Sequence, residues 1–154
     1  MAKKLQLKID YFDEYHMLAI VSHLKDYRLA FHINQKLGSR FKKYDDLKIV
    51  NGDDHKHAWY CCHEKEDHMT LYLVSNSGPD IKLIPSKREI DFFLLIKNAI
   101  SSKKIDEIAR GIRSIQNVVG VFNQNMSVIK DMDIILETLE LHELEQMKKK
   151  TKHK

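Results

Sequence analysis

The spacing of hydrophobic positions changes along this chain and predicts a series of strands and helices. Apolar residues alternate with polar ones over 5–10, which is the period of a half-buried strand. Over 13–24 the apolar residues keep a helical spacing although several are β-branched, and we interpret this segment as a helix. Over 26–38 one apolar face lies between Asp26, a candidate N-cap, and Gly38, which suits the left-handed position after a helix. These segments predict one strand followed by two helices.

From 39 to 98 the pattern is one of short apolar segments separated by turn residues, which predicts an antiparallel meander. The last of these strands carries apolar residues on both faces. One face has Ile90, Phe92, Leu94 and Ile96, and the other has Phe93 and Leu95. A strand with two apolar faces is typical of the centre of a sheet that is covered on both sides.

The third part of the chain returns to helical spacing. Isoleucines recur at helical intervals over 101–115, where Ser102 is a candidate N-cap, and an apolar strand follows over 117–125. Residues 90–125 therefore predict a strand-helix-strand unit. A last helical pattern over 132–150 predicts a C-terminal helix. The fold class is α+β, a meander sheet packed against two or three helices and a C-terminal helix.

The composition is that of a globular protein, since 43% of the 154 residues are hydrophobic and 31% are charged. We expect a single α+β domain over 1–131, followed by a helix and Lys-rich tail over 132–154. The apolar runs are too short to span a membrane, and the first residues lack the apolar core of a secretory signal. Cys61 and Cys62 are adjacent and predicted to be reduced thiols, as in a cytoplasmic protein.

The positive charge of the chain is concentrated in its tail. The whole chain carries +4, and because residues 148–154 contribute +5 of charge, residues 1–147 carry −1. A nearly neutral body lacks the basic face of a dedicated nucleic-acid-binding domain. The lysines available for a contact with an acidic partner are Lys148, Lys149, Lys150, Lys152 and Lys154. A solvated, frayed chain end is the simpler interpretation of the same residues.

The segment HKHAWYCCHEKEDH, residues 55–68, contains four histidines and two cysteines. Because both residue types bind metals, this segment is a candidate metal site. In one strand over 57–63, Cys61 and Cys62 would face opposite sides, so they could not bind the same ion. His57 and Cys61 would share a face but lie roughly 13 Å apart along the strand, much farther than two zinc ligands. We therefore predict no metal site and no cofactor.

The stretch LIPSKREIDFFLLIKN, residues 83–98, resembles the bacterial IPExxxVDY family. The matching positions are Ile84, Pro85 and Asp91, with Ile90 and Phe92 where the family has Val and Tyr. HLKDYRL over 23–29 is also similar to that family, whereas Ser86 departs from the family's Glu. The family has no established activity, so the resemblance implies a fold and a bacterial cytoplasmic setting.

Asp91 is the main candidate binding residue. A carboxylate at the start of a strand with two apolar faces needs a partner, and Arg28 or Arg88 could supply it. A structural ion pair is the favoured interpretation, and a general base or ligand anchor is the alternative. Pro85, which lacks a backbone N–H, is expected at the end of an edge strand.

The remaining candidate is His23, which could shuttle a proton with Asp26 or simply accompany a helix cap. No phosphate-binding glycine loop and no nucleophile elbow are found. The sequence therefore predicts a binding or adaptor domain rather than an enzyme, which contacts a protein or a ribonucleoprotein through its C-terminal helix and tail. Weak RNA binding through the tail, or small-molecule sensing or catalysis in a pocket near Asp91, are the alternatives.

Overall fold

The computed structural model describes residues 14–44, 46–48, 56–77, 82–99 and 101–152. Its elements are β1 (Tyr15–Ser22), α2 (Asp26–Leu37), β2 (Lys42–Lys43), β3 (Leu47–Lys48), β4 (Lys56–His57), β5 (Trp59–Glu64), β6 (Met69–Ser75), η1 (Pro85–Lys87), β7 (Phe92–Lys97), α3 (Ser102–Arg113), β8 (Val118–Gln124), η2 (Met126–Val128) and α4 (Met132–Lys152). The strand predicted over 5–10 lies outside the described residues.

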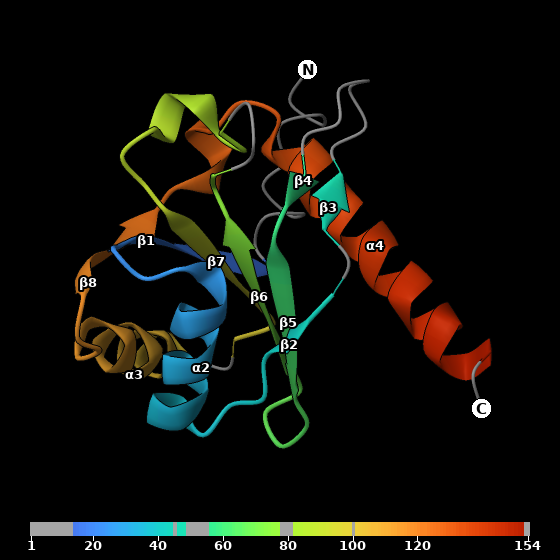
Figure 1. Ribbon diagram of the computed structural model, residues 1–154, viewed down its shortest axis with the longest axis horizontal. Helices are drawn as coiled ribbons and strands as arrows, with labels where there is room; N and C mark the ends of the chain where they lie inside the picture. Colours follow the sequence, from blue (N-terminus) through green and yellow to red (C-terminus); the bar gives the residue numbers. More distant parts are fainter. Residues whose placement is uncertain (1–13, 45, 49–55, 78–81, 100, 153–154) are drawn as a thin grey trace.

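A six-stranded sheet in the order β2-β5-β6-β7-β1-β8 forms the centre of the fold (Figure 1). β5, β6 and β7 follow one another as an antiparallel meander, which confirms the prediction for this part of the chain. β1 pairs antiparallel with β7 on one side and with β8 on the other. The predicted strand-helix-strand unit is therefore formed by β7, α3 and β8, with β1 inserted between its two strands. The α+β fold class is confirmed.

The helix predicted over 13–24 is wrong, because this segment contains the central strand β1. Met17 and Ala19 face one side of the sheet, and Leu18 and Ile20 face the other. All four are at most 1% exposed. A strand buried on both faces loses the alternation of apolar and polar residues, so its continuous apolar run can be mistaken for a helix.

Two hydrophobic layers lie on opposite faces of the sheet. α2 and α3 cover one face, and α4 covers part of the other (Figure 1). The first layer includes Leu18, Ile20, Leu29, Ile33, Leu94, Ile108 and Ile112, and the second includes Met17, Trp59, Tyr72, Phe93, Leu95, Leu136 and Leu139. β7 contributes side chains to both layers. This confirms the prediction that it is a central strand covered on both faces. Ile90 precedes β7 and belongs to the layer of Phe93, not to that of Phe92.

The ends of α2 and α3 differ from the prediction in two residues. Lys25 occupies the N-cap of α2 without a side-chain cap, and Asp26 lies in the first turn. Gly38 has φ 65° after α2, the left-handed conformation that glycine adopts without strain. Ser101, rather than Ser102, caps α3 by accepting a hydrogen bond from the backbone N–H of Lys104 at 3.3 Å.

α4 confirms the predicted C-terminal helix and divides into two parts. Met132, Ile135, Leu136 and Leu139 are buried against the sheet, whereas Leu141 and Leu144 are 57% and 56% exposed. The last turns extend beyond the sheet (Figure 1). α4 is also the longest helix described, and within the described residues no helix combines the length and apolar character needed to cross a bilayer.

Candidate functional site

Asp91, the main candidate from sequence, has a backbone partner. It precedes β7, and its Oδ2 accepts a hydrogen bond from the backbone N–H of Ser22 at 2.9 Å. Its own backbone N–H donates to the carbonyl of Ile20 at 3.0 Å. Among the ion pairs of the described residues none joins Asp91 to Arg28 or Arg88, so the predicted ionic partner is wrong. Asp91 fixes the end of β1 beside β7.

Asn76, which the sequence analysis did not single out, completes this arrangement. Its side chain is fully buried, and its amide nitrogen donates to the carbonyls of Lys87 at 2.9 Å and Ile90 at 2.8 Å. Its amide oxygen accepts from the backbone N–H of Ile84 at 2.8 Å. The residues of the IPExxxVDY-like stretch are thus held against the end of β6 by hydrogen bonds, which is a structural role.

Pro85 differs from its predicted setting, whereas His23 lies just before the N-cap residue of α2. Pro85 is exposed and begins the short helix η1, so the strand end predicted for it is wrong. His23 is exposed, and its backbone N–H donates to the carbonyl of Asn117. Asp26 accepts a hydrogen bond from the hydroxyl of Tyr60 at 2.6 Å and forms no ion pair with His23. The described contacts of His23 and Asp26 therefore give no support to the proton-shuttling alternative.

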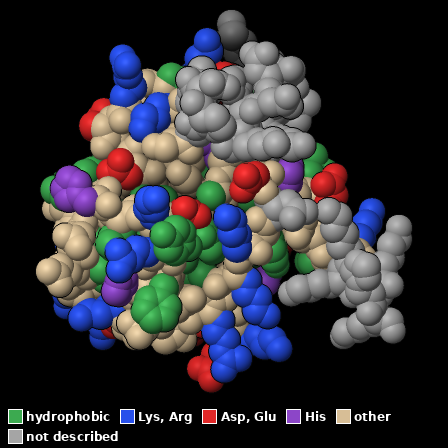
Figure 2. All heavy atoms as spheres, in the orientation of Figure 1, with side chains coloured by type: hydrophobic (Ala, Val, Ile, Leu, Met, Phe, Trp, Pro, Cys, Tyr) green, Lys and Arg blue, Asp and Glu red, His purple; other side chains and the backbone are tan. Residues whose placement is uncertain are grey.

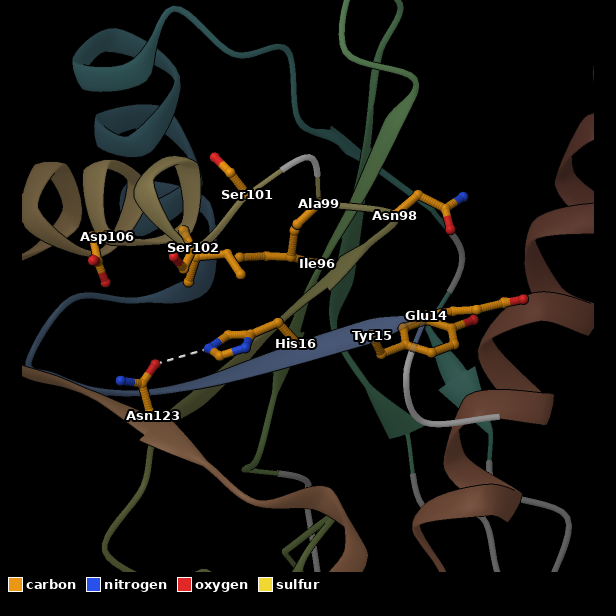
Figure 3. Close-up of a pocket in the computed structure, with 11 residues that line it drawn as sticks. Glu14, Tyr15, His16, Ile96, Asn98, Ala99, Ser101, Ser102, Asp106 and Asn123 are labelled. Carbon is orange, nitrogen blue, oxygen red and sulfur yellow. Dashed lines mark hydrogen bonds between the residues drawn. The ribbon is translucent and has the colours of Figure 1, made fainter. Parts of the chain in front are cut away.

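A hollow of about 650 Å³ lies at the C-terminal end of β7, between β1, β8 and the start of α3 (Figure 3). His16 Nε2 lies 2.8 Å from Asn123 Oδ1, and Ser101 and Asp106 line the side formed by α3. Asn can orient an imidazole but cannot exchange a proton with it at neutral pH. Asp91 does not line this hollow, because it lies at the opposite end of β7.

A second group of reactive side chains forms where α4 lies on β5. Cys61 and His63 share one face of β5, and Glu143 reaches them from α4. His63 Nε2 lies 3.6 Å from Cys61 Sγ and 3.3 Å from Glu143 Oε1. The three ligand atoms all lie within 4.8 Å of one another. Cys62 belongs to the opposite hydrophobic layer, as the alternation of side chains predicted.

We call Cys61, His63 and Glu143 the Cys-His-Glu cluster. Its surroundings keep the thiol protonated and the carboxylate hydrogen-bonded. Burial raises the pKa of the Cys61 thiol well above its usual range, and the charge of Glu143 raises it further. Burial also raises the pKa of Tyr72, whose hydroxyl donates a hydrogen bond to Glu143 Oε2. Burial raises the pKa of Tyr44 to about 12. The thiol is therefore neutral at pH 7 as long as no cation binds beside it.

The exposed apolar side chains lie mainly on two helices. Leu141 and Leu144 lie on α4, and Tyr27 and Phe31 lie on α2 with exposed fractions of 58% and 56%. Figure 2 shows hydrophobic side chains on the face over α2, surrounded by Lys and Arg side chains. Arg28 is exposed on the same helix.

The predicted tail contact is described only in part. Lys148 is an exposed residue of α4. Lys149, Lys150 and Lys152 belong to the same helix, but their side chains lie outside the described part of the structure, as does Lys154. The helix therefore carries the basic segment at least as far as Lys152.

Comparisons with known proteins give no further assignment. No protein-family model matches the chain, and no curated protein matches it. Its resemblance to the IPExxxVDY family therefore stays a prediction that rests on the residues of 83–98.

Proposed function

We propose that this chain is a protein-binding domain of the cytoplasm. It associates through the exposed face of α4 around Leu141 and Leu144, and its partner is a second copy of the chain. The observation that carries the proposal is the exposure of Leu141 and Leu144, because Glu143 of the same turns contacts β5 and β6 while these two leucines face solvent. Single exposed leucines are common on protein surfaces. Two of them one turn apart, on a helix whose preceding turns are docked, form a stripe that a second helix can cover.

The charge pattern of α4 favours a second copy in the antiparallel direction. In an antiparallel pair in which Leu141 packs against Leu144 of the second copy, position 137 lies opposite position 148. These positions hold Glu137 and Lys148, both exposed. The twofold symmetry of such a pair repeats every contact, so that it contains two leucine layers and two opposite-charge pairs. Charges arranged in this way specify the direction of helix pairing more than they strengthen it.

The expected association is weak. A leucine side chain contributes roughly 1.5–3 kcal/mol when fully buried, and these leucines are already partly covered. The cost of immobilising two molecules is at least about 4 kcal/mol. Four leucines in a short helix pair therefore support a dissociation constant of roughly micromolar to millimolar size. Such an interface suits a reversible adaptor.

Sedimentation velocity of the full chain over a wide concentration range tests this proposal. We expect a dimer that forms at high concentration and is lost in the double variant Leu141→Glu/Leu144→Glu. The matched control is Tyr27→Glu/Phe31→Glu, which changes two equally exposed apolar residues on α2 and should leave the dimer intact. A chain that stays monomeric at millimolar concentration, or a dimer that survives the α4 variant, overturns the proposal.

A charge exchange tests the direction of the pair. Glu137→Lys alone should weaken the dimer because position 137 would then face Lys148 of the second copy. Adding Lys148→Glu should restore it, since each pair again has opposite charges. Restoration by the double variant would be inconsistent with a parallel pair, in which position 137 faces position 137.

RNA binding through the tail remains the alternative, and the Lys-rich end of α4 supports it. Fluorescence anisotropy with a single-stranded RNA would measure it as a function of salt concentration. Binding that falls steeply with salt and disappears when the tail lysines are replaced by Gln would favour this alternative. A small-molecule site near Asp91 has less support, because the side chain of that residue accepts the backbone N–H of Ser22.

A further inference from the structure

We infer that Cys61, His63 and Glu143 bind a divalent transition-metal ion, and that Zn²⁺ fits their geometry and chemistry best. Thiolate, imidazole and carboxylate are the three protein ligand types of zinc. Two come from β5 and the third from α4, so one ion would join the helix to the sheet. The spacing of Cys61 to His57 and Cys62 predicts no metal, whereas the structure groups Cys61 with His63, two positions away, and with Glu143.

The distances between the ligand atoms agree with a tetrahedral ion. Zinc bonds of about 2.3 Å to sulfur and about 2.0–2.2 Å to nitrogen and oxygen place tetrahedral S and N ligands about 3.5 Å apart, and N and O ligands about 3.3 Å apart. The observed distances are 3.6 Å from Cys61 Sγ to His63 Nε2 and 3.3 Å from His63 Nε2 to Glu143 Oε1. Cys61 Sγ and the Glu143 carboxylate lie within 4.8 Å of each other, so a small movement of these two side chains completes the set.

Hydrogen bonding alone accounts less well for the same arrangement. His63 Nε2 faces both the sulfur and the carboxylate, but a ring nitrogen carries at most one hydrogen to donate. A cation at this point interacts favourably with all three atoms at once. It also stabilises the thiolate form of Cys61, because a coordinating thiol is deprotonated by the metal.

The outer contacts of the Cys-His-Glu cluster orient the ligand atoms. His63 Nδ1 lies 3.2 Å from the hydroxyl oxygen of Thr70, which can accept its hydrogen and leave the Nε2 lone pair for the metal. Tyr72 donates its hydroxyl to Glu143 Oε2, which leaves Oε1 for the metal. Metal-binding histidines and carboxylates commonly have such hydrogen-bonded partners.

The site is open on one side. The side chain of Glu143 is 15% exposed and that of His63 is 44% exposed, whereas Cys61 is buried. Three protein ligands leave one tetrahedral position, which water can occupy from the exposed side. The structure thus assigns a three-ligand zinc site that an exchangeable ligand can reach.

Cobalt substitution tests the site directly. The full chain, treated with chelator and then titrated with Co²⁺, should show the intense visible bands of a tetrahedral ion and a near-ultraviolet thiolate-to-cobalt band, saturating at one ion per chain. Zn²⁺ added afterwards should remove both. Folded protein without the thiolate band overturns the inference, and so does a titration that never saturates.

Variants identify the ligands. His63→Gln changes an exposed side chain, so it should fold and yet lose most of the metal affinity. Thr70→Ala should weaken binding by about 10–100-fold, the usual effect of removing an outer contact. Cys61→Ser should abolish the thiolate band, and Cys62→Ser, which alters the adjacent thiol on the other face, should retain it. A band that depends on Cys62 and not on Cys61 would also overturn the inference.

Binding should in addition stabilise the fold. A ligand that binds only the native state raises the stability by about 2.7 kcal/mol at a hundred times its dissociation constant. The melting temperature of the wild-type chain should therefore rise with Zn²⁺, and that of His63→Gln should not. An equal rise in both would indicate binding elsewhere.

Discussion

Asn76 offers the sharpest test of how the residues between β6 and β7 are held. Its amide makes three hydrogen bonds, to the carbonyls of Lys87 and Ile90 and from the N–H of Ile84. Asn76→Ala removes all three and leaves the backbone groups without their partner. Each backbone group left without a partner in the interior costs about 1–3 kcal/mol of stability. The carbonyl of Lys87 is only partly buried, so water can hydrogen-bond to it and reduce this loss. We expect a total loss of about 3–5 kcal/mol.

Urea denaturation followed by circular dichroism measures this loss. For a chain of this length, about 1 kcal/mol corresponds to roughly 2–4 °C in melting temperature, so thermal denaturation should show a drop of at least about 6 °C. The matched control is Ser75→Ala, which removes the single hydrogen bond from the Ser75 hydroxyl to the carbonyl of Ser77. It should cost about 0.5–1.5 kcal/mol.

A second substitution separates hydrogen bonding from volume. Asn76→Asp keeps the shape of the side chain but replaces the amide donor with an oxygen that faces two carbonyls. We expect it to be at least as destabilising at pH 7 as Asn76→Ala. A loss below about 1 kcal/mol for both variants would refute the reasoning, because the three contacts would then contribute nothing beyond what water provides.

Three further predictions concern α4, Asp91 and the cysteines. Leu139→Ala should destabilise the fold by about 2–5 kcal/mol in urea denaturation because Leu139 is fully buried, while Leu144→Ala should change the stability by no more than about 0.5 kcal/mol. Asp91→Ala should cost about 1–3 kcal/mol in thermal denaturation and Asp91→Asn less, since an amide oxygen still accepts the N–H of Ser22; equal losses would contradict this role. Burial raises the pKa of Cys62 from about 9 to about 11, and that of Cys61 higher still. Because unfolded thiols ionise first, the free energy of unfolding of the metal-free, chelator-treated chain should fall from pH 8 to pH 10 by up to about 1.4 kcal/mol per pH unit and thiol, and a constant value would count against the pKa shifts.

The elements with one apolar face could be predicted from sequence, and those buried on both faces only in part. α3 has a regular isoleucine stripe and Gly38 ends α2, so both helices were predicted almost to the residue. The segment of β1 predicts a helix because hydrophobic layers cover both faces of the sheet there, so its apolar residues do not alternate with polar ones. The pattern around Pro85 predicted a strand, but Asn76 holds this segment in a short helix instead.

The candidate sites depended on contacts that spacing alone does not reveal. The pairing of Cys61 with His63 was visible in the sequence, because side chains two apart in a strand share a face. Glu143 could not be connected with them, since the docking of α4 on β5 decides which of its acidic residues points to that face. Asp91 was correctly expected to need a partner, but a backbone N–H supplies it. A sequence shows which residues carry a charged side chain that could pair with Asp91. It does not show which backbone N–H group the fold brings beside that carboxylate.

The position of β1 in the sheet has a consequence for the order in which the chain can fold. β1 is the first strand described, yet it pairs only with β7 and β8, whose residues begin at Phe92 and Val118. During synthesis an apolar strand with two buried faces therefore leaves the ribosome long before either partner exists. The hairpin of β5 and β6 can form meanwhile from local contacts, whereas the centre of the sheet closes late through contacts of high sequence separation. The nascent chain thus exposes MLAIV until nearly the whole sheet has been made, which is the kind of segment that chaperones protect from aggregation.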